Sequence, residues 1–358
     1  MSNKTPVTTF EGQLGHLTPD QEKAFAEFKQ LCAEKGIYTP AEAGKPASHD
    51  DIFMIRFLRA RRFVTADALI LFSDSEEWRK AEKIDDVYDH FDVGEYEQCR
   101  KLHPQWTGRR DRDGMPLFVY TISHVSGTNL TEYTAAKNKL QRLAMLYETV
   151  TQFVIPVANA VHVRARNHAA PAPKPTTETA PTADPEKKLE SVSSITIITD
   201  IGNVGLWTFW NLKGHMQESA KIASDRYPET LHRQYIVNAP SFFPTVWGWI
   251  KKWFDPVTTS KITILSGSLT LKELREQLEV CIAPENLPKK YGGDLDWDYG
   301  DVPDVDEEIR EVVGEDVFAD GGLTGPVRWV VGGKGMVGRA VKVGSIGGKD
   351  RRGDKPDA

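Results

Sequence analysis

The sequence predicts an α/β protein in which a small helical unit precedes a domain built on a mostly parallel sheet. Two observations support this fold class. Up to about residue 85, apolar residues recur with the period of an α-helix, and from about residue 100 short apolar runs typical of buried strands alternate with helical segments. Strands that alternate with helices usually pair in parallel and carry the helices on their faces, so this order predicts a sheet covered by helices.

The composition excludes several classes of protein. Of the 358 residues, 40% are hydrophobic and 27% charged, and the formal net charge is −6. This charge argues against nucleic acid as a partner, because phosphate contacts need a broad basic face. Cys32, Cys99 and Cys281 are widely spaced, so we expect no disulfide framework and no metal site, and infer a reducing compartment. No apolar run is long enough to span a bilayer, so we expect a cytoplasmic protein that is at most peripheral to organelle membranes.

A helical N-terminal subdomain is predicted over residues 18–85, after a flexible N-terminus of residues 1–17. Thr18 and Pro19 suit the first turn of a helix, and Gly36 suits its C-terminal end. The segments DDIFMIRFLRARRF and TADALILFSDSEEWRKAEK continue the helical period and predict two further helices.

The second domain is expected over residues 95–295. Its strand candidates are PLFVYTI, SSITIITDI, QYIVNAP and SKITILSG, and helical segments are expected near 205–222, 241–254 and 270–280. Residues 166–188 are rich in Pro, Thr and Ala and nearly free of large apolar residues, so we expect a disordered insertion. Residues 296–358 are acidic and then basic and Gly-rich, which predicts a largely disordered tail.

Motifs for catalysis and cofactor binding are missing from the sequence. It contains no G-x-S-x-G nucleophile elbow, no H-E-x-x-H zinc pair and no phosphate-binding G-x-x-x-x-G-K-[ST] loop. Gly333, Gly335 and Gly338 have dinucleotide-fingerprint spacing, but a dinucleotide fold needs an acidic ribose ligand about twenty residues further on. We therefore expect no enzymatic activity and no cofactor.

Residues 241–261, SFFPTVWGWIKKWFDPVTTSK, concentrate aromatic side chains beside paired lysines. On a helical wheel the apolar positions span an arc of about 160°, wider than the stripe of roughly 100° that an ordinary surface helix buries. Either the helix is deeply buried, or one edge packs on the sheet while the other faces a lipid, a membrane or a partner. The candidate residues of this helix are Phe242, Phe243, Val246, Trp247, Trp249, Ile250, Trp253 and Phe254.

The turn that follows, DPVTTSK, brings hydroxyls, backbone N–H groups and the Lys261 ammonium together before a strand. This mixture suits a phosphate or a polyol, although an Asp-Pro turn with solvated hydroxyls would have the same sequence.

Four segments in this order resemble the CRAL-TRIO lipid-binding family, in particular its phosphatidylinositol/phosphatidylcholine transfer branch. They are FLRARRF, DRDGMPLFVY, YPETLHRQYIVNAPSFFPTVWGWIKKWFDPVTTSKITIL and PENLPKKYGG, within residues 18–295. The resemblance implies a sheet that forms the floor of an apolar lipid cavity. It also implies a gate helix, here residues 241–254, that opens at a membrane to exchange lipid.

The resemblance also implies an inositol-phosphate site. The matching positions are Arg61, Arg62, Glu229, Thr258 and Lys261. Cations and a hydroxyl suit the phosphate, and a carboxylate suits the inositol hydroxyls.

The phosphatidylcholine site of the family matches less well. Its tyrosines are replaced by Trp106, Thr107 and Phe118, whereas Tyr147 is kept and Ser194 and Thr196 lie near the strand that supplies hydroxyls. Fewer hydroxyls leave a phosphate short of donors, although an aromatic box can still hold a quaternary ammonium.

The sequence therefore predicts non-enzymatic binding and transfer, or presentation, of phospholipid, with phosphatidylinositol as the expected ligand and a membrane surface as a transient partner. The alternative is a carrier or sensor for phosphatidylcholine, a sterol, a tocopherol-like lipid or haem. A lipid kinase or another protein partner is compatible with either function.

Overall fold

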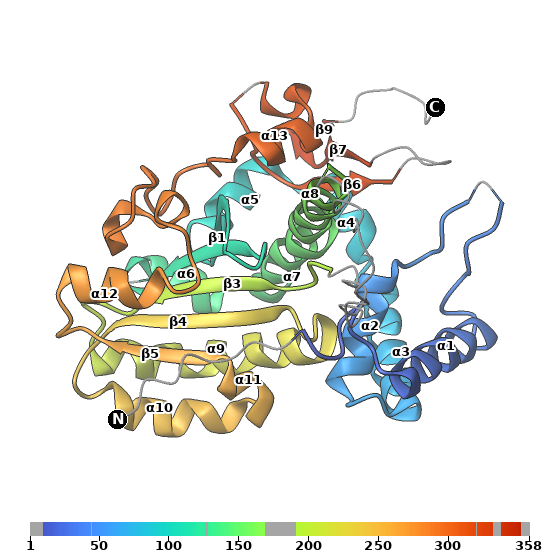
Figure 1. Cartoon of the computed structure of the whole chain (residues 1–358). Coiled ribbons are helices and arrows are strands. Elements are labelled where there is room, and N and C mark those ends of the chain that lie inside the picture. Colours follow the sequence, from blue (N-terminus) through green and yellow to red (C-terminus); the bar gives the residue numbers. More distant parts are fainter. Residues whose placement is uncertain are drawn as a thin grey trace, which may run out of the picture.

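The computed structural model describes residues 10–43, 45–125, 128–168, 191–319, 321–331 and 338–351. The expected N-terminal helices form, and they lie at one end of the sheet (Figure 1). Thr18 caps the first helix through a capping box with Gln21, as its sequence predicts. The helices of this part are α1 (Pro19–Glu34), α2 (Asp51–Ala60), α3 (Thr65–Ala81), α4 (Ile84–His90) and α5 (Val93–Arg100).

Residues 10–17 correct the expectation of a flexible N-terminus for the part that the structure describes. Leu17 is buried, and the Gln13 side chain accepts a hydrogen bond from Ser193 Oγ at 3.2 Å. The Phe10 ring stacks on His16 and His232. An aromatic ring and a buried amide thus attach this segment to the second domain.

The predicted mostly parallel sheet is confirmed. Its five strands follow one another in chain order; β1 is antiparallel to β2, and the others pair in parallel. The strands are β1 (Gln105–Arg110), β2 (Pro116–Thr121), β3 (Ile195–Asp200), β4 (Leu231–Ala239) and β5 (Ile262–Ser266). A short 3-10 turn follows β2 at Ile122–His124, and two others lie beyond β5, at Pro284–Asn286 and Lys289–Tyr291.

Helices connect the parallel strands, as the alternation in the sequence predicts. Between β2 and β3 lie α6 (Thr128–Ala135), α7 (Lys139–Thr149), a π-helical turn (Val150–Val154) and α8 (Ile155–His168). The connection from β3 to β4 is α9 (Leu206–Arg226). Between β4 and β5 lie α10 (Phe243–Ile250), a 3-10 turn (Lys251–Trp253) and α11 (Pro256–Ser260), and α12 (Leu271–Leu278) follows β5.

Side-chain alternation along the strands gives the sheet two buried faces. On one face, Val119, Ile198 and Val237 pack against α12 and the segment that follows it. On the opposite face, Phe118 packs against the π-helical turn and α8, and Ile236 packs against α9 and α10. We call the second face the cavity face.

The predicted insertion lies mostly outside the described residues, because α8 ends at His168 and the description resumes at Ser191. Gly333 and Gly335 also fall outside the described residues.

The C-terminal segment corrects the expectation of a largely disordered tail. Residues 305–351, where described, form a folded C-terminal unit that lies beside α8 and carries α13 (Figure 1). Ile309 is fully buried, and Val313 and Val327 join the same core as Phe118. The elements are α13 (Glu307–Val313), a 3-10 turn (Glu315–Phe318), β6 (Val327–Val330), β7 (Arg339–Lys342), β8 (Ser345–Ile346) and β9 (Lys349–Asp350). Val343 is also fully buried, in a second core with Ile84 and Tyr88. The sparse apolar residues of the unit suffice because they enter cores that other elements already form.

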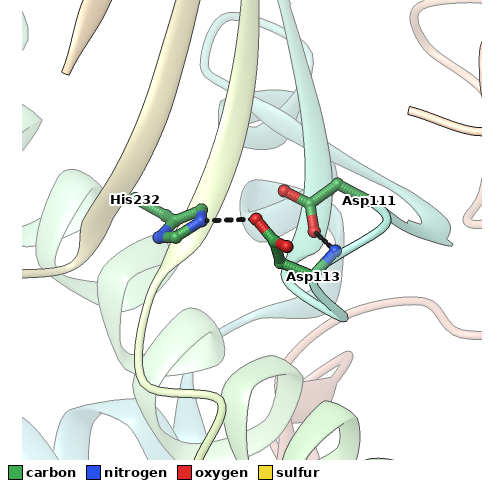
Figure 2. A group of neighbouring side chains, drawn as sticks. All are labelled: Asp111, Asp113 and His232. Carbon is green, nitrogen blue, oxygen red and sulfur yellow. Dashed lines mark hydrogen bonds and ion pairs between the residues drawn. The ribbon is translucent and has the colours of Figure 1, made fainter. Parts of the chain in front are cut away.

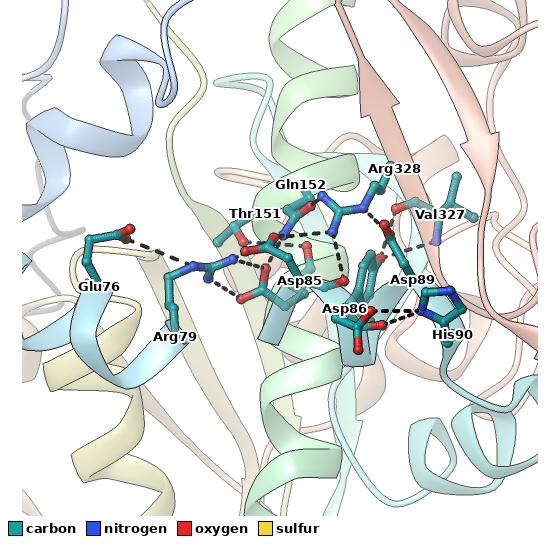
Figure 3. Close-up of polar contacts among 12 residues, drawn as sticks. Glu76, Arg79, Asp85, Asp86, Asp89, His90, Thr151, Gln152, Val327 and Arg328 are labelled. Atoms are coloured by element: carbon teal, nitrogen blue, oxygen red, sulfur yellow. Dashed lines mark hydrogen bonds and ion pairs between the residues drawn. The ribbon is translucent and has the colours of Figure 1, made fainter. Parts of the chain in front are cut away.

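A polar network attaches the C-terminal unit to the helices (Figure 3). Arg328 on β6 forms ion pairs with Asp89 and, at 3.2 Å, with Asp85, and it donates to the Gln152 side chain. Beside it, the Tyr88 hydroxyl donates to the Val327 carbonyl at 2.8 Å. Arg328 and Asp89 are largely buried, so they hold each other in place, whereas Asp85 is 61% exposed and its ion pair contributes less.

Candidate functional site

Three charged side chains from separate elements meet beside the N-terminal helices. The Glu229 carboxylate lies 3.1 Å from Arg59 Nη2 and 3.0 Å from Lys261 Nζ, through the same oxygen. All three side chains are about 14–15% exposed. Two cations and one carboxylate leave a net charge of +1, so the group can accept an anion without losing its internal ion pairs. We call Arg59, Glu229 and Lys261 the cationic cluster.

The parallel sheet explains why these residues meet. Glu229 lies just before β4 and Lys261 just before β5, so both are at the amino edge of adjacent parallel strands. The Gln234 N–H donates to the Lys261 carbonyl at 2.9 Å, which fixes this edge. Helix α2 then brings Arg59 to the same place. Glu229 has a φ of 56°, a conformation uncommon for a residue with a side chain.

Two arginines of α2, Arg56 and Arg59, have little or no exposure to solvent. Arg56 is 2% exposed, and its Nε and Nη1 atoms have no hydrogen-bond partner among the described residues. Burial lowers the pKa of Arg56 to about 10, and burial also lowers the pKa of Arg59 against the opposing effect of Glu229. Arg59 Nη1 likewise lacks a partner. The end of α2 therefore holds cationic hydrogen-bond donors that no described protein group uses.

The other residues predicted for the headgroup site, Arg61, Arg62 and Thr258, do not belong to the cationic cluster. Arg61 donates to the neighbouring Ala60 carbonyl at 3.2 Å, and Arg62 is exposed with a φ of 50°. The Thr258 hydroxyl donates to Asp255 Oδ2 at 2.6 Å. Burial raises the pKa of Asp255, but hydrogen bonds from Thr258 and Val257 lower it below its ordinary value on balance. Glu229 and Lys261 are thus in contact, whereas the hydrogen bonds of Arg61 and Thr258 go to residues outside this pair.

Sequence reasoning missed Arg56 and Arg59. The signal was present, because these residues are three apart and share a face of α2 with residues that the helical period assigns to the interior. A charged side chain on such a face is rare unless it has a partner.

An apolar cavity of about 120 Å³ lies on the cavity face. Trp106, Phe118 and Tyr147, named for the second headgroup site, all line it. The Tyr147 ring is stacked on Tyr227, with centroids 4.6 Å apart and an interplanar angle of 9°. Further wall residues come from the π-helical turn and the C-terminal unit: Val150, Phe153, Val154, Leu323 and Val327.

The hydroxyls predicted near this cavity point elsewhere. Ile195 and Ile197 of β3 line the cavity, so the alternating Ser194 and Thr196 face the opposite side of the sheet. Thr196 donates to Asp111 at 2.6 Å, and Ser194 lies 3.7 Å from the Met115 sulfur. The assignment of Ser194 and Thr196 to the cavity was therefore wrong by one residue of register, which exchanges the two faces of a strand.

Helix α10 divides its aromatic surface between the core and solvent. Phe243, Val246 and Ile250 are buried on the cavity face, whereas Trp249 is 50% exposed. Phe242, Trp247, Trp253 and Phe254 are partly buried against the same core. The wide apolar arc thus has one edge on the sheet and one edge free of it.

Helix α9 extends the exposed aromatic surface. Trp207 is 73% and Trp210 60% exposed, and Leu206 beside them is exposed as well. A groove of about 390 Å³ runs between α9 and α10, lined by Trp210, Trp249 and Trp253 together with Lys213 and Lys252. We call the exposed residues Leu206, Trp207, Trp210 and Trp249 the aromatic patch.

Asp111, Asp113 and His232 form a separate polar group at the start of the sheet (Figure 2). Arg233 lies 2.6 Å from Asp113 and so supplies a positive charge at the position where a metal ion would bind. Burial raises the pKa of Asp111, while the hydrogen bond with His232 helps to lower the pKa of Asp113. We interpret this group as a link between the β1–β2 turn and β4.

Helices that could cross a bilayer are absent from the part of the chain that the structure describes.

Comparisons with known proteins agree with the fold. The CRAL/TRIO domain matches residues 101–293, and the CRAL/TRIO N-terminal domain matches residues 24–74. The chain is 30% identical over 295 residues to the SEC14 cytosolic factor of Candida glabrata, across 82% of this chain and 85% of that protein. It is 29% identical over 276 residues to the phosphatidylinositol/phosphatidylcholine transfer protein SFH9 of Arabidopsis thaliana, across 76% of this chain and 41% of that protein.

Among solved structures, the crystal structure of Sfh5 is similar over 85% of this chain and 99% of that chain, with 15% identity and a TM-score of 0.48, too distant a likeness to argue from. The C-terminal unit lies beyond both family matches. Those matches cover most of α1 to α3 and the whole sheet, and on that ground the chain belongs to the CRAL/TRIO domain family.

Proposed function

We propose that this chain binds phosphatidylinositol and moves it between membranes, or presents it there, without changing it chemically. The observation that carries the proposal is the cationic cluster. Its net charge of +1 matches the single negative charge of a phosphodiester, and the Glu229 carboxylate is an acceptor for inositol hydroxyls. The name of the similar SFH9 protein, a phosphatidylinositol/phosphatidylcholine transfer protein, is consistent with this ligand.

The apolar cavity and the aromatic patch offer apolar surface to the rest of the lipid, and the cavity of about 120 Å³ must widen to hold two acyl chains. Two acyl chains hold roughly 30 methylenes, and moving them into water costs on the order of 20 kcal/mol. Transfer therefore requires that the cavity open directly against a bilayer. Tryptophan favours the membrane interface and lysine is attracted to anionic headgroups, so α9 and α10 are the proposed docking surface, with α10 as the gate. This assigns the protein a peripheral association with organelle membranes.

A transfer assay tests the proposal. Purified protein should accelerate the movement of labelled phosphatidylinositol between vesicles, and Lys261→Ala should reduce the rate about tenfold or more. Lys272→Ala, which alters an exposed lysine of α12, is the matched control and should transfer like the original protein. No acceleration by the original protein, or equal rates for both variants, would contradict the proposed site.

A second candidate is favoured by the cavity wall itself. Ile195, Ile197, Trp106 and Phe118 line the cavity without a hydroxyl group. Such a wall suits a ligand less polar than a phosphatidylcholine headgroup, such as a sterol-type lipid. Mass spectrometry of lipids that copurify with the protein distinguishes this ligand from phosphatidylinositol.

A further inference from the structure

His103 is a buried histidine in the wall of the apolar cavity. It lies in the turn after α5, is 6% exposed, and contacts the Tyr133 ring with centroids 4.8 Å apart. Its backbone carbonyl accepts a hydrogen bond from the Tyr299 hydroxyl at 2.7 Å, which helps to fix the turn. The ring is therefore held in one place beside the cavity.

The hydrogen bonds of the ring define its tautomer. His103 Nδ1 lies 2.9 Å from the Cys99 carbonyl oxygen, and a carbonyl oxygen can only accept, so Nδ1 carries the hydrogen. Burial lowers the pKa of His103 to about 4, so the ring is neutral near pH 7. Nε2 must then carry a lone pair and no hydrogen.

Nε2 has no hydrogen-bond partner among the residues that the structure describes. Polar neighbours in the cavity wall are already engaged. The Tyr96 hydroxyl is hydrogen-bonded to Thr149 Oγ1 at 2.7 Å. The Arg100 guanidinium donates to the side chains of Glu97 and Gln105 and to the backbone carbonyls of residues 300 and 301. A buried acceptor without a donor is unfavourable, and a ligand that supplies the donor removes this cost.

We propose that His103 Nε2 accepts a hydrogen bond from the hydroxyl of a lipid alcohol bound in the apolar cavity. The ligand class is an apolar body with one hydroxyl, as in a long-chain alcohol, a sterol or a diacylglycerol. A quaternary ammonium has no hydrogen to donate and does not meet this requirement. The proposal rests on the proposed function only in that the cavity binds lipid, and it is independent of the cationic cluster.

The test compares hexadecan-1-ol with its methyl ether, because the two differ in the hydroxyl hydrogen. Binding is measured by displacement of a fluorescent fatty-chain probe from the full chain. The original protein should prefer the alcohol about tenfold. His103→Asn, whose amide can replace Nδ1 but not Nε2, should lose the preference. His103→Gln, whose amide oxygen can reach the Nε2 position, should retain it.

His215→Asn is the matched control, since His215 is also buried and also contacts Tyr133 but does not line the cavity. It should keep the preference for the alcohol. Equal binding of alcohol and ether by the original protein, or an unchanged preference in His103→Asn, overturns the role of His103 while leaving lipid binding intact. Binding of neither compound overturns lipid binding by the cavity as well.

Discussion

Glu229 and Lys261 form a 3.0 Å ion pair from the residues that precede two neighbouring parallel strands. Removing the carboxylate leaves the Arg59 and Lys261 cations close together without compensation. We therefore expect Glu229→Gln to lower the free energy of unfolding by about 3 kcal/mol, and inorganic phosphate to restore part of it. Urea denaturation with and without phosphate measures both effects. Glu218→Gln, which breaks an exposed pair with Lys139, should cost less than about 1 kcal/mol, and equal losses would argue against the cluster.

Arg56 and Arg79 provide a contrast between two arginines with little exposure. Arg79 is paired with the fully buried Glu148 at 2.7 Å, so Arg79→Met should lower the free energy of unfolding by about 3–5 kcal/mol. Arg56 has unpartnered donors, so Arg56→Met should leave the lipid-free protein equally stable or more stable. The same variant should retain less phosphatidylinositol after purification. A loss of stability in Arg56→Met as large as in Arg79→Met would refute the interpretation of Arg56 as a ligand donor.

The aromatic patch predicts how the protein binds membranes. Replacing Trp207, Trp210 and Trp249 together by alanine should weaken binding to anionic vesicles about tenfold or more, because each ring loses apolar contact with the bilayer. Added salt should weaken the binding of the original protein, since Lys213 and Lys252 contribute attraction to anionic headgroups. Vesicle sedimentation measures both. The exposed Val280 lies after α12, and Val280→Ala should bind normally; a similar loss there would count against the patch.

His103 and His215 predict a loss of stability in acid. Burial lowers the pKa of each to about 4, whereas a histidine in the unfolded chain titrates near pH 6.5. Between these values the unfolded state binds more protons, so the free energy of unfolding falls as the pH decreases from about 6.5 to about 4. For His103 the full effect is about 3 kcal/mol. Urea denaturation at pH 7 and pH 4.5 should show a smaller loss in His103→Asn, and identical losses would disprove the contribution of His103.

The sequence predicted the elements that depend on local chemistry. The capping box at Thr18 follows from residue types at fixed spacing, and so does the alternation of strands with helices. The wide apolar arc of residues 241–254 left two alternatives open, a deeply buried helix or a helix with one exposed edge. The exposure of Trp249 on α10 agrees with the second. These features can be predicted without knowing which residues far apart in the sequence come into contact.

The remaining features depend on contacts between distant residues. Hydroxyls occur at several positions around β3, and only the pairing with β2 and β4 determines that Ile195 and Ile197 face the cavity. The helical period alone assigns Arg59 to the interior face of a helix. Its role in a charged cluster follows only from the sheet, which places Glu229 beside it. The C-terminal unit has too few apolar residues to predict a fold, because the core that they enter is formed by β1, β2 and α8.

The C-terminal unit makes the cavity depend on a segment outside both family matches. Leu323 and Val327 line the cavity and Arg328 fastens them, yet these residues follow every strand of the sheet in the chain. Sequence changes in this segment can therefore alter the shape of the ligand site while leaving the sheet and its helices unchanged.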